Sequence, residues 1–143
     1  PTIEVRVADV PATVAESVTF AALVRGCVMT ALEEHRRSEP VQPLAAFALK
    51  AAYWKAARDG LVGDSLDLQE HAPAPTRQLL EQLVERVRPA LEQVGDYELV
   101  SSGLAGVAER GNGAMRQQAA WRRGHQVADV LAEAAAATLE SPS

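Results

Sequence analysis

Residues 2–8 of this 143-residue chain alternate polar and apolar side chains in the order Thr-Ile-Glu-Val-Arg-Val-Ala. A period of two is typical of a β-strand with one buried face, and Asp9-Val10-Pro11 then ends the strand. The rest of the chain has helical patterns, so the strand lacks an evident sheet of its own. Unpaired backbone N–H and C=O groups are costly to bury. We therefore expect a sheet completed by another part of the protein or by another chain.

Helical periodicity dominates the chain from Thr13 onward. The sequence Thr13-Val14-Ala15-Glu16 matches a capping box, in which a hydroxyl and a carboxylate bond the free N–H groups at a helix start. Pro89 predicts a kink in the third helix or its division into two, and Gly103 and Gly106 weaken the fourth. We expect helices over 13–37, 43–60, 76–94, 97–109, 114–123 and 126–139, with a loop or short hairpin near 61–75.

The apolar positions of two of these helices define the expected core. In the first helix the apolar face consists of Val14, Val18, Ala21, Ala22, Val24, Val28, Ala31 and Leu32. In the third it consists of Leu79, Leu80, Leu83, Val87 and Leu91. Trp54 and Trp121 are expected to anchor the core, and Cys27 to be a buried, unreactive thiol.

Composition narrows the classes of function. The net charge of −5 and the pI of about 5.2 argue against a chain whose main task is holding nucleic acid, because phosphate neutralisation needs a basic surface. The apolar stretches look too short and too interrupted by charge to span a bilayer. One cysteine excludes an internal disulfide framework. No secretory signal is visible, so we expect a cytoplasmic protein.

The sequence starts at Pro1 and has no initiator Met. Processing, the design of an expressed fragment or a cut in a longer polypeptide would each explain this start.

Glu4 and Arg6 are the sharpest chemical signal in the sequence. At positions i and i+2 of a strand they share a face. A carboxylate can bind Mg²⁺, and a guanidinium can form two parallel hydrogen bonds to the oxygens of a phosphate. Spacing alone favours the simpler interpretation, a solvated ion pair. Lys50, Lys55 and Arg58 on the second predicted helix form a candidate basic cluster for an anionic ligand. An ordinary solvated helix flank is the alternative, and it is favoured most for Lys50.

Residues 2–14, Thr-Ile-Glu-Val-Arg-Val-Ala-Asp-Val-Pro-Ala-Thr-Val, resemble a segment of the carboxylate–amine ligases related to type 2 glutamate–cysteine ligase. That segment has the pattern Glu-x-Arg-x-x-Asp, and it is more distantly similar to the Glu-x-Arg strand of glutamine synthetases. The resemblance implies that Glu4 is a metal ligand and that Arg6 is a catalytic residue bound to the nucleotide phosphates. Asp9 matches the Asp of the family pattern.

Three further segments continue the resemblance in the same order. Residues 54–61, Trp-Lys-Ala-Ala-Arg-Asp-Gly-Leu, resemble the family's Trp-Arg-Ala-x-Arg-Tyr-Gly-Leu. Residues 88–92, Arg-Pro-Ala-Leu-Glu, fit the family's third-helix region. Residues 109–117, Glu-Arg-Gly-Asn-Gly-Ala-Met-Arg-Gln, resemble its Arg-Gly-x-Gly-Ala-x-Arg-Gln run. The match departs just before Trp54, where the family has Glu-Asn and a basic residue and this chain has Ala51-Ala52-Tyr53. Arg116 and Gln117 can alternatively pin their helix to its neighbours.

The resemblance implies an α+β fold, in which residues 1–10 form one strand of an antiparallel catalytic sheet like that of glutamine synthetase. Residues 13–139 then form a mostly helical region, and 1–143 is the C-terminal part of a single ligase domain. The implied activity is ATP- and Mg²⁺-dependent amide formation between amino acids, with Arg6, Lys55 and Arg58 binding ATP. The implied partner is the N-terminal part of the same ligase, on the same or a separate chain, and a homo-oligomer stays open. The alternative is a non-catalytic helical interaction module or a ligase-derived protein that has lost its activity.

Overall fold

The structure is a computed structural model that describes residues 2–41 and 43–140. Within these residues it has six helices and one two-stranded antiparallel sheet, so the α+β class with a mostly helical region is confirmed. Pro1 and the last three residues of the predicted domain lie outside the described residues. The elements are α1 (Val14–Arg36), α2 (Ala46–Asp59), β1 (Asp64–Asp67), β2 (Ala72–Pro75), α3 (Thr76–Val94), α4 (Tyr97–Arg110), α5 (Gly113–Gly124) and α6 (Val127–Thr138).

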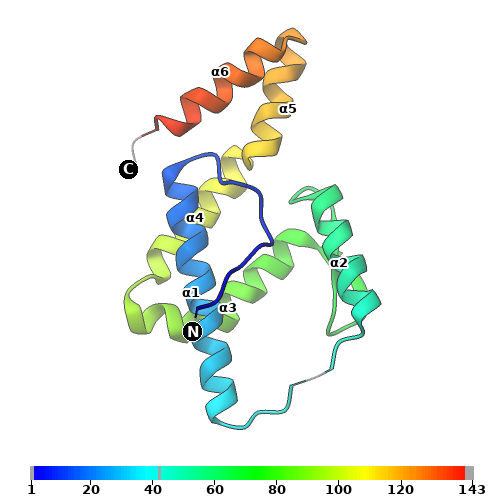
Figure 1. The fold of residues 1–143 in the computed structure, drawn as a ribbon, viewed down its shortest axis with the longest axis vertical. Coiled ribbons are helices and arrows are strands. Elements are labelled where there is room, and N and C mark those ends of the chain that lie inside the picture. Colours follow the sequence, from blue (N-terminus) through cyan, green and yellow to red (C-terminus); the bar gives the residue numbers. More distant parts are fainter. Residues whose placement is uncertain (1, 42, 141–143) are drawn as a thin grey trace.

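Helices α1, α3 and α4 pack together and hold the hydrophobic core (Figure 1). Leu91 and Val87 of α3 and Val100 of α4 are its largest fully buried side chains. Small residues let the helices approach closely. A Cβ added to Gly103 of α4 would clash with the side chain of Thr19 of α1, so glycine is required at this crossing.

The face that α1 buries differs in part from the predicted one. The helix buries Thr19, Ala22, Leu23 and Gly26 against its neighbours. Val14, Val18 and Leu32, which were predicted to be in the core, are about half exposed. The helix is thus turned so that its small residues meet α3 and α4, while a row of larger apolar residues faces outward.

Helix α1 also corrects the argument about membranes. An 18-residue stretch of α1 has a mean hydropathy of 1.4. By length and composition alone, this helix is long and apolar enough to cross a bilayer. The prediction that no stretch qualifies was therefore wrong. In the structure, part of this apolar character serves the contact with α3 and α4. One such helix is weak evidence for a membrane span, because core helices pass the same test.

Helix α2 stands to the side of the core and is connected to α3 through the β1–β2 hairpin (Figure 1). The hairpin pairs Asp64 with Pro75 and Asp67 with Ala72, which confirms the hairpin predicted near 61–75. None of the residues of α2 is buried. The expectation that Trp54 anchors the core was wrong, since its side chain is 61% exposed.

Helices α5 and α6 form a hairpin that extends from one end of the molecule (Figure 1). Trp121, at the far end of α5, is 43% exposed and packs edge-on against His125, so it too is not a core anchor. Helix α3 passes through Pro89 as one element and is not divided. Cys27 is half-buried beside the core, and this burial raises the pKa of its thiol.

Residues 2–10 do not form a β-strand in this structure, which corrects the first expectation. Ile3, Val5 and Val7 would form the buried face of that strand, but here they are exposed. The physical reason is the missing neighbour, because a strand needs a second strand to accept and donate its ladder hydrogen bonds. Among the described residues, the strands β1 and β2 pair only with each other.

Candidate functional site

Glu4 and Arg6 lie on the extended segment that precedes α1, and they bind each other. Arg6 Nε donates to Glu4 Oε1 at 2.7 Å, and Arg6 Nη2 donates to Glu4 Oε2 at 3.0 Å. The side chain of Arg6 is 80% exposed, and that of Glu4 is 70% exposed. The two residues therefore share a face, as the i, i+2 spacing predicts. In this geometry the carboxylate and the guanidinium satisfy each other and remain accessible to a ligand.

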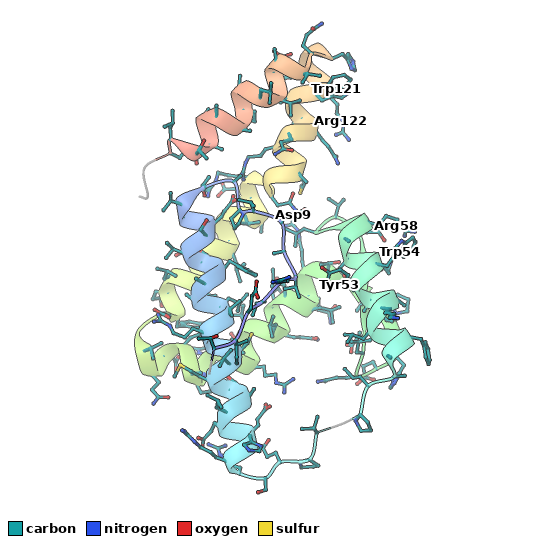
Figure 2. The ribbon with its side chains drawn as sticks, viewed as in Figure 1. Asp9, Tyr53, Trp54, Arg58, Trp121 and Arg122 are labelled. Carbon is teal, nitrogen blue, oxygen red and sulfur yellow. The ribbon has the colours of Figure 1, made fainter. Side chains whose placement is uncertain are left out.

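Tyr53 connects this segment to α2. Its hydroxyl donates to the carbonyl oxygen of Arg6 at 3.4 Å. In Figure 2, Tyr53 lies on the side of α2 toward the N-terminal segment, whereas Trp54 and Arg58 lie on the opposite side. Of the three residues that depart from the family pattern, Tyr53 is thus the one whose side chain bonds the backbone of Arg6.

Lys55 and Arg58 meet at Asp59 instead of converging on Glu4 and Arg6. Lys55 Nζ lies 2.9 Å from Asp59 Oδ2, and Arg58 Nε lies 2.6 Å from Asp59 Oδ1. The hydrogen bonds from Arg58 and then from Lys55 hold the pKa of the Asp59 carboxyl well below its usual range. The guanidinium of Arg58 also stacks 4.4 Å above the Trp54 ring. Asp59 therefore offsets much of the positive charge of this cluster.

Glu16 and Arg116 form a second, more enclosed ion pair at the start of α1. Arg116 Nη2 lies 2.8 Å from Glu16 Oε1, and the side chains are only 16% and 12% exposed. The other oxygen, Glu16 Oε2, accepts the backbone N–H of Ala12 at 3.0 Å. The hydroxyl of Thr13 accepts the N–H of Glu16, which confirms this half of the predicted capping box. The carboxylate of Glu16 bonds the N–H of Ala12 and not that of Thr13.

The loop before α5 brings further segments to the same place. Asn112 caps α5 by accepting the N–H of Met115 at 2.9 Å. A Cβ added to Gly113 would lie 3.1 Å from Ala12 Cβ, and one added to Gly60 would lie 3.9 Å from Asn112 Nδ2. Three of the four segments that carry the family resemblance, 2–14, 54–61 and 109–117, therefore meet at one junction, whereas the fourth, 88–92, lies within α3. We call the residues Ala12, Glu16, Gly60, Asn112 and Arg116 the motif junction.

The described residues do not complete a metal site. They contain no group of three or more His, Cys, Asp or Glu side chains that could hold a metal ion. Magnesium prefers six oxygen ligands in near-octahedral geometry. Glu4 can supply one or two of these oxygens once Arg6 turns away. The remaining protein ligands would have to come from outside the described residues.

A cavity of about 310 Å³ lies between α3 and α4, and Leu61 also lines it. Its walls are mainly apolar and include Leu80, Val84 and Leu104. Ser101 Oγ is buried and has no hydrogen-bond partner among the described residues. The cavity contains none of the residues that the sequence singled out for chemistry.

The chain matches the model of glutamate-cysteine ligase family 2 over residues 1–135. It belongs to this family. This match confirms the family resemblance that was inferred from the sequence motifs.

Two relatives show how much of a ligase the chain represents. It is 70% identical over 140 residues to a Mycolicibacterium vanbaalenii protein named "Putative glutamate–cysteine ligase 2-2". It is 61% identical over 140 residues to a Mycolicibacterium smegmatis protein named "Putative glutamate–cysteine ligase 2-3". The matches cover 98% and 97% of this chain but 38% of each relative, so the chain spans well under half of their length. No solved structure matches the chain.

Sequence reasoning missed three contributors to this region. Tyr53 was seen only as a departure from a motif. Glu16 was seen only as a cap, because its contact with Arg116 joins residues 100 positions apart. Asp59 could have been found, since Lys55 and Asp59 at i, i+4 on one helix are an expected ion pair.

Proposed function

We propose that this chain is the C-terminal part of an ATP-dependent ligase that joins a carboxylate to an amine. Membership of glutamate-cysteine ligase family 2 and the names of the relatives support glutamate as the carboxylate donor and cysteine as the amine. Because the chain covers 38% of those relatives, the proposal assigns the rest of the active site to the remaining part of the ligase. It also places the protein in the cytoplasm.

The observation that carries the proposal is the motif junction. Segments 2–14, 54–61 and 109–117 are far apart in sequence, yet Ala12, Gly60 and Asn112 lie at adjoining contacts. The junction holds the end of the segment on which Glu4 and Arg6 lie. If the likeness of these three segments to the family were accidental, there would be no reason for them to lie next to each other in the structure.

The proposed reaction has two steps. A γ-carboxylate oxygen of glutamate attacks the γ-phosphorus of ATP, the bond to the bridging oxygen breaks, and ADP leaves. The amine nitrogen of cysteine then attacks the acyl carbon of the acyl phosphate, the carbon–oxygen bond breaks, and phosphate leaves as the nitrogen loses a proton. Arg6 would bind the transferred phosphoryl group and offset its charge. Glu4 would hold Mg²⁺, which neutralises phosphate charge when bound.

The direct test replaces the matched 140 residues of the full-length Mycolicibacterium vanbaalenii relative with this chain. The graft is assayed for ADP release and γ-glutamylcysteine formation. We expect activity that needs ATP and Mg²⁺, and we expect Glu4→Gln and Arg6→Met each to reduce kcat about 100-fold or more. Unchanged turnover in Glu4→Gln would contradict the proposed metal role.

A ligase-derived protein without activity is the second candidate. Ala51-Ala52-Tyr53 stands where the family has Glu-Asn and a basic residue, and Tyr53 makes a backbone contact. If that change removed the chemistry, the graft would release no ADP with any mixture of amino acids. The unmodified relative, assayed in parallel, shows whether the assay itself works.

A further inference from the structure

We infer that Glu16 and Arg116 are positioning residues that set where the Glu4–Arg6 segment enters the active site. This inference rests on the proposed function, because it concerns the placement of the proposed metal and phosphate groups. It adds two residues with no contact to substrate, and it assigns them a measurable effect on metal dependence.

Both oxygens of Glu16 and both terminal nitrogens of Arg116 bind protein groups. Glu16 Oε1 accepts from Arg116, and Glu16 Oε2 accepts from the N–H of Ala12. Arg116 Nη1 also donates to the carbonyl oxygen of Gly111 at 2.6 Å. Little of either side chain is exposed, 16% of Arg116 and 12% of Glu16. Their chemistry is that of a clamp joining the start of α1, residue 12 and the loop before α5.

The clamp acts at the base of the segment that carries Glu4 and Arg6. Ala12 is the last residue before the cap of α1, and its N–H is held by Glu16. The same residue packs against Gly113, where a Cβ would come within 3.1 Å of Ala12 Cβ. The direction in which residues 2–11 leave the helix is therefore fixed from two sides. If the clamp opened, Glu4 and Arg6 would lose a defined position relative to the rest of the ligase.

A comparable ion pair elsewhere in the molecule serves as a control. Arg86 Nη2 of α3 lies 2.8 Å from Glu34 Oε1 at the other end of α1. This pair also joins distant parts of the chain, and its hydrogen bonds run between α1 and α3. It is more exposed than the Arg116–Glu16 pair, with Arg86 55% and Glu34 33% exposed. Removing it tests the cost of losing a helix–helix ion pair without disturbing the segment.

The experiment uses the full-length graft with Arg116→Met, Arg116→Lys and the control Arg86→Met. We expect Arg116→Met to raise the Mg²⁺ concentration for half-maximal activity about 10- to 100-fold, as for other residues that orient a metal ligand. The KM for cysteine should change much less. A lysine side chain keeps the positive charge, so Arg116→Lys should recover part of the effect. Arg86→Met should leave the Mg²⁺ dependence unchanged.

A second measurement does not depend on activity. Amide hydrogen exchange over residues 4–13 of the full-length graft should be faster in Arg116→Met and unchanged in Arg86→Met. Glu16→Gln repeats the test with a smaller change if Arg116→Met fails to fold. Equal Mg²⁺ dependence and equal exchange in the two Met variants would overturn the inference. Loss of the Glu4→Gln effect alone would instead contradict the proposed function and leave the exchange result valid.

Discussion

The core of α1, α3 and α4 and the peripheral region formed by residues 2–12 and α2 both carry large apolar side chains. The core buries Val87, Leu91 and Val100 completely. The peripheral region leaves Ile3 and Phe47 70% and 79% exposed, and α2 buries no residue at all. The core therefore holds the chain together, and under the proposed function the exposed apolar side chains of the peripheral region would be covered by the remaining part of the ligase.

The largest expected effect comes from removing a core side chain. Leu91→Ala deletes a fully buried side chain, so it should lower the free energy of unfolding of the purified chain by about 2–5 kcal/mol. Urea denaturation followed by circular dichroism measures this change. A loss below about 0.5 kcal/mol would show that this core side chain stabilises the chain no more than an exposed side chain of the peripheral region does.

Gly103→Ala tests how closely α1 and α4 pack. Helix propensity alone predicts stabilisation by about 1 kcal/mol. The structure predicts the opposite sign, a loss of about 1–3 kcal/mol, because the new Cβ would meet Thr19. Gly106→Ala is the matched control on the same helix, since its Cβ would meet only the flexible guanidinium of Arg110. It should be neutral or stabilising in the same denaturation assay.

Thr13→Ala should have an intermediate effect. It removes the acceptor of the Glu16 N–H at the start of α1 and should cost about 1 kcal/mol, as for other helix caps. Thermal unfolding of the purified chain measures the loss, and Thr13→Ser, which keeps a hydroxyl acceptor, is the control. Equal losses in both variants would show that the cap hydrogen bond is not the cause.

Apolar side chains of the peripheral region should matter little to the stability of the purified chain. Phe47→Ala should change the free energy of unfolding by no more than about 0.5 kcal/mol, because Phe47 is largely exposed. The same substitution in the full-length graft should cost more, if the rest of the ligase covers α2. A similar small effect in both proteins would argue against that covering.

The smallest expected effect is on the acid side of the pH profile. The folded-state pKa of Asp59 is lowered relative to the ordinary value of 3.8. Its contribution to stability is therefore present above about pH 4 and is lost as the pH falls below that value. NMR titration of the Asp59 carboxyl should show a midpoint below 3.8. In Lys55→Met with Arg58→Met the midpoint should return toward that value.

The local sequence pattern correctly predicted the features that depend on residues close together in the chain. The capping box at Thr13 begins α1, Gly60 ends α2 at a φ of +58°, and Leu80, Leu83, Val87 and Leu91 of α3 contribute to the core as their spacing predicts. The face shared by Glu4 and Arg6 also follows from their spacing. These features depend on contacts within a few residues, where periodicity carries the necessary information.

Long-range contacts limited what pattern could say about the site. The Glu16–Arg116 pair joins residues 100 positions apart, and no spacing rule connects them. Trp54 and Trp121 were expected in the core on residue type alone, but burial depends on which neighbours reach them. The predicted strand at residues 2–8 lacks a partner among the described residues, so its alternating pattern is not enough to form a strand.

The sequence by itself determined the helices, the cap at Thr13 and the ligase family, because these follow from local periodicity and from motifs in order. Only the tertiary structure decided that Gly103 is a packing residue, that Asp59 offsets Lys55 and Arg58, and that three distant motifs meet at Ala12 and Asn112. The reason is physical. Close packing and charge pairing are set by distances in space, and a single sequence does not state which distant residues become neighbours.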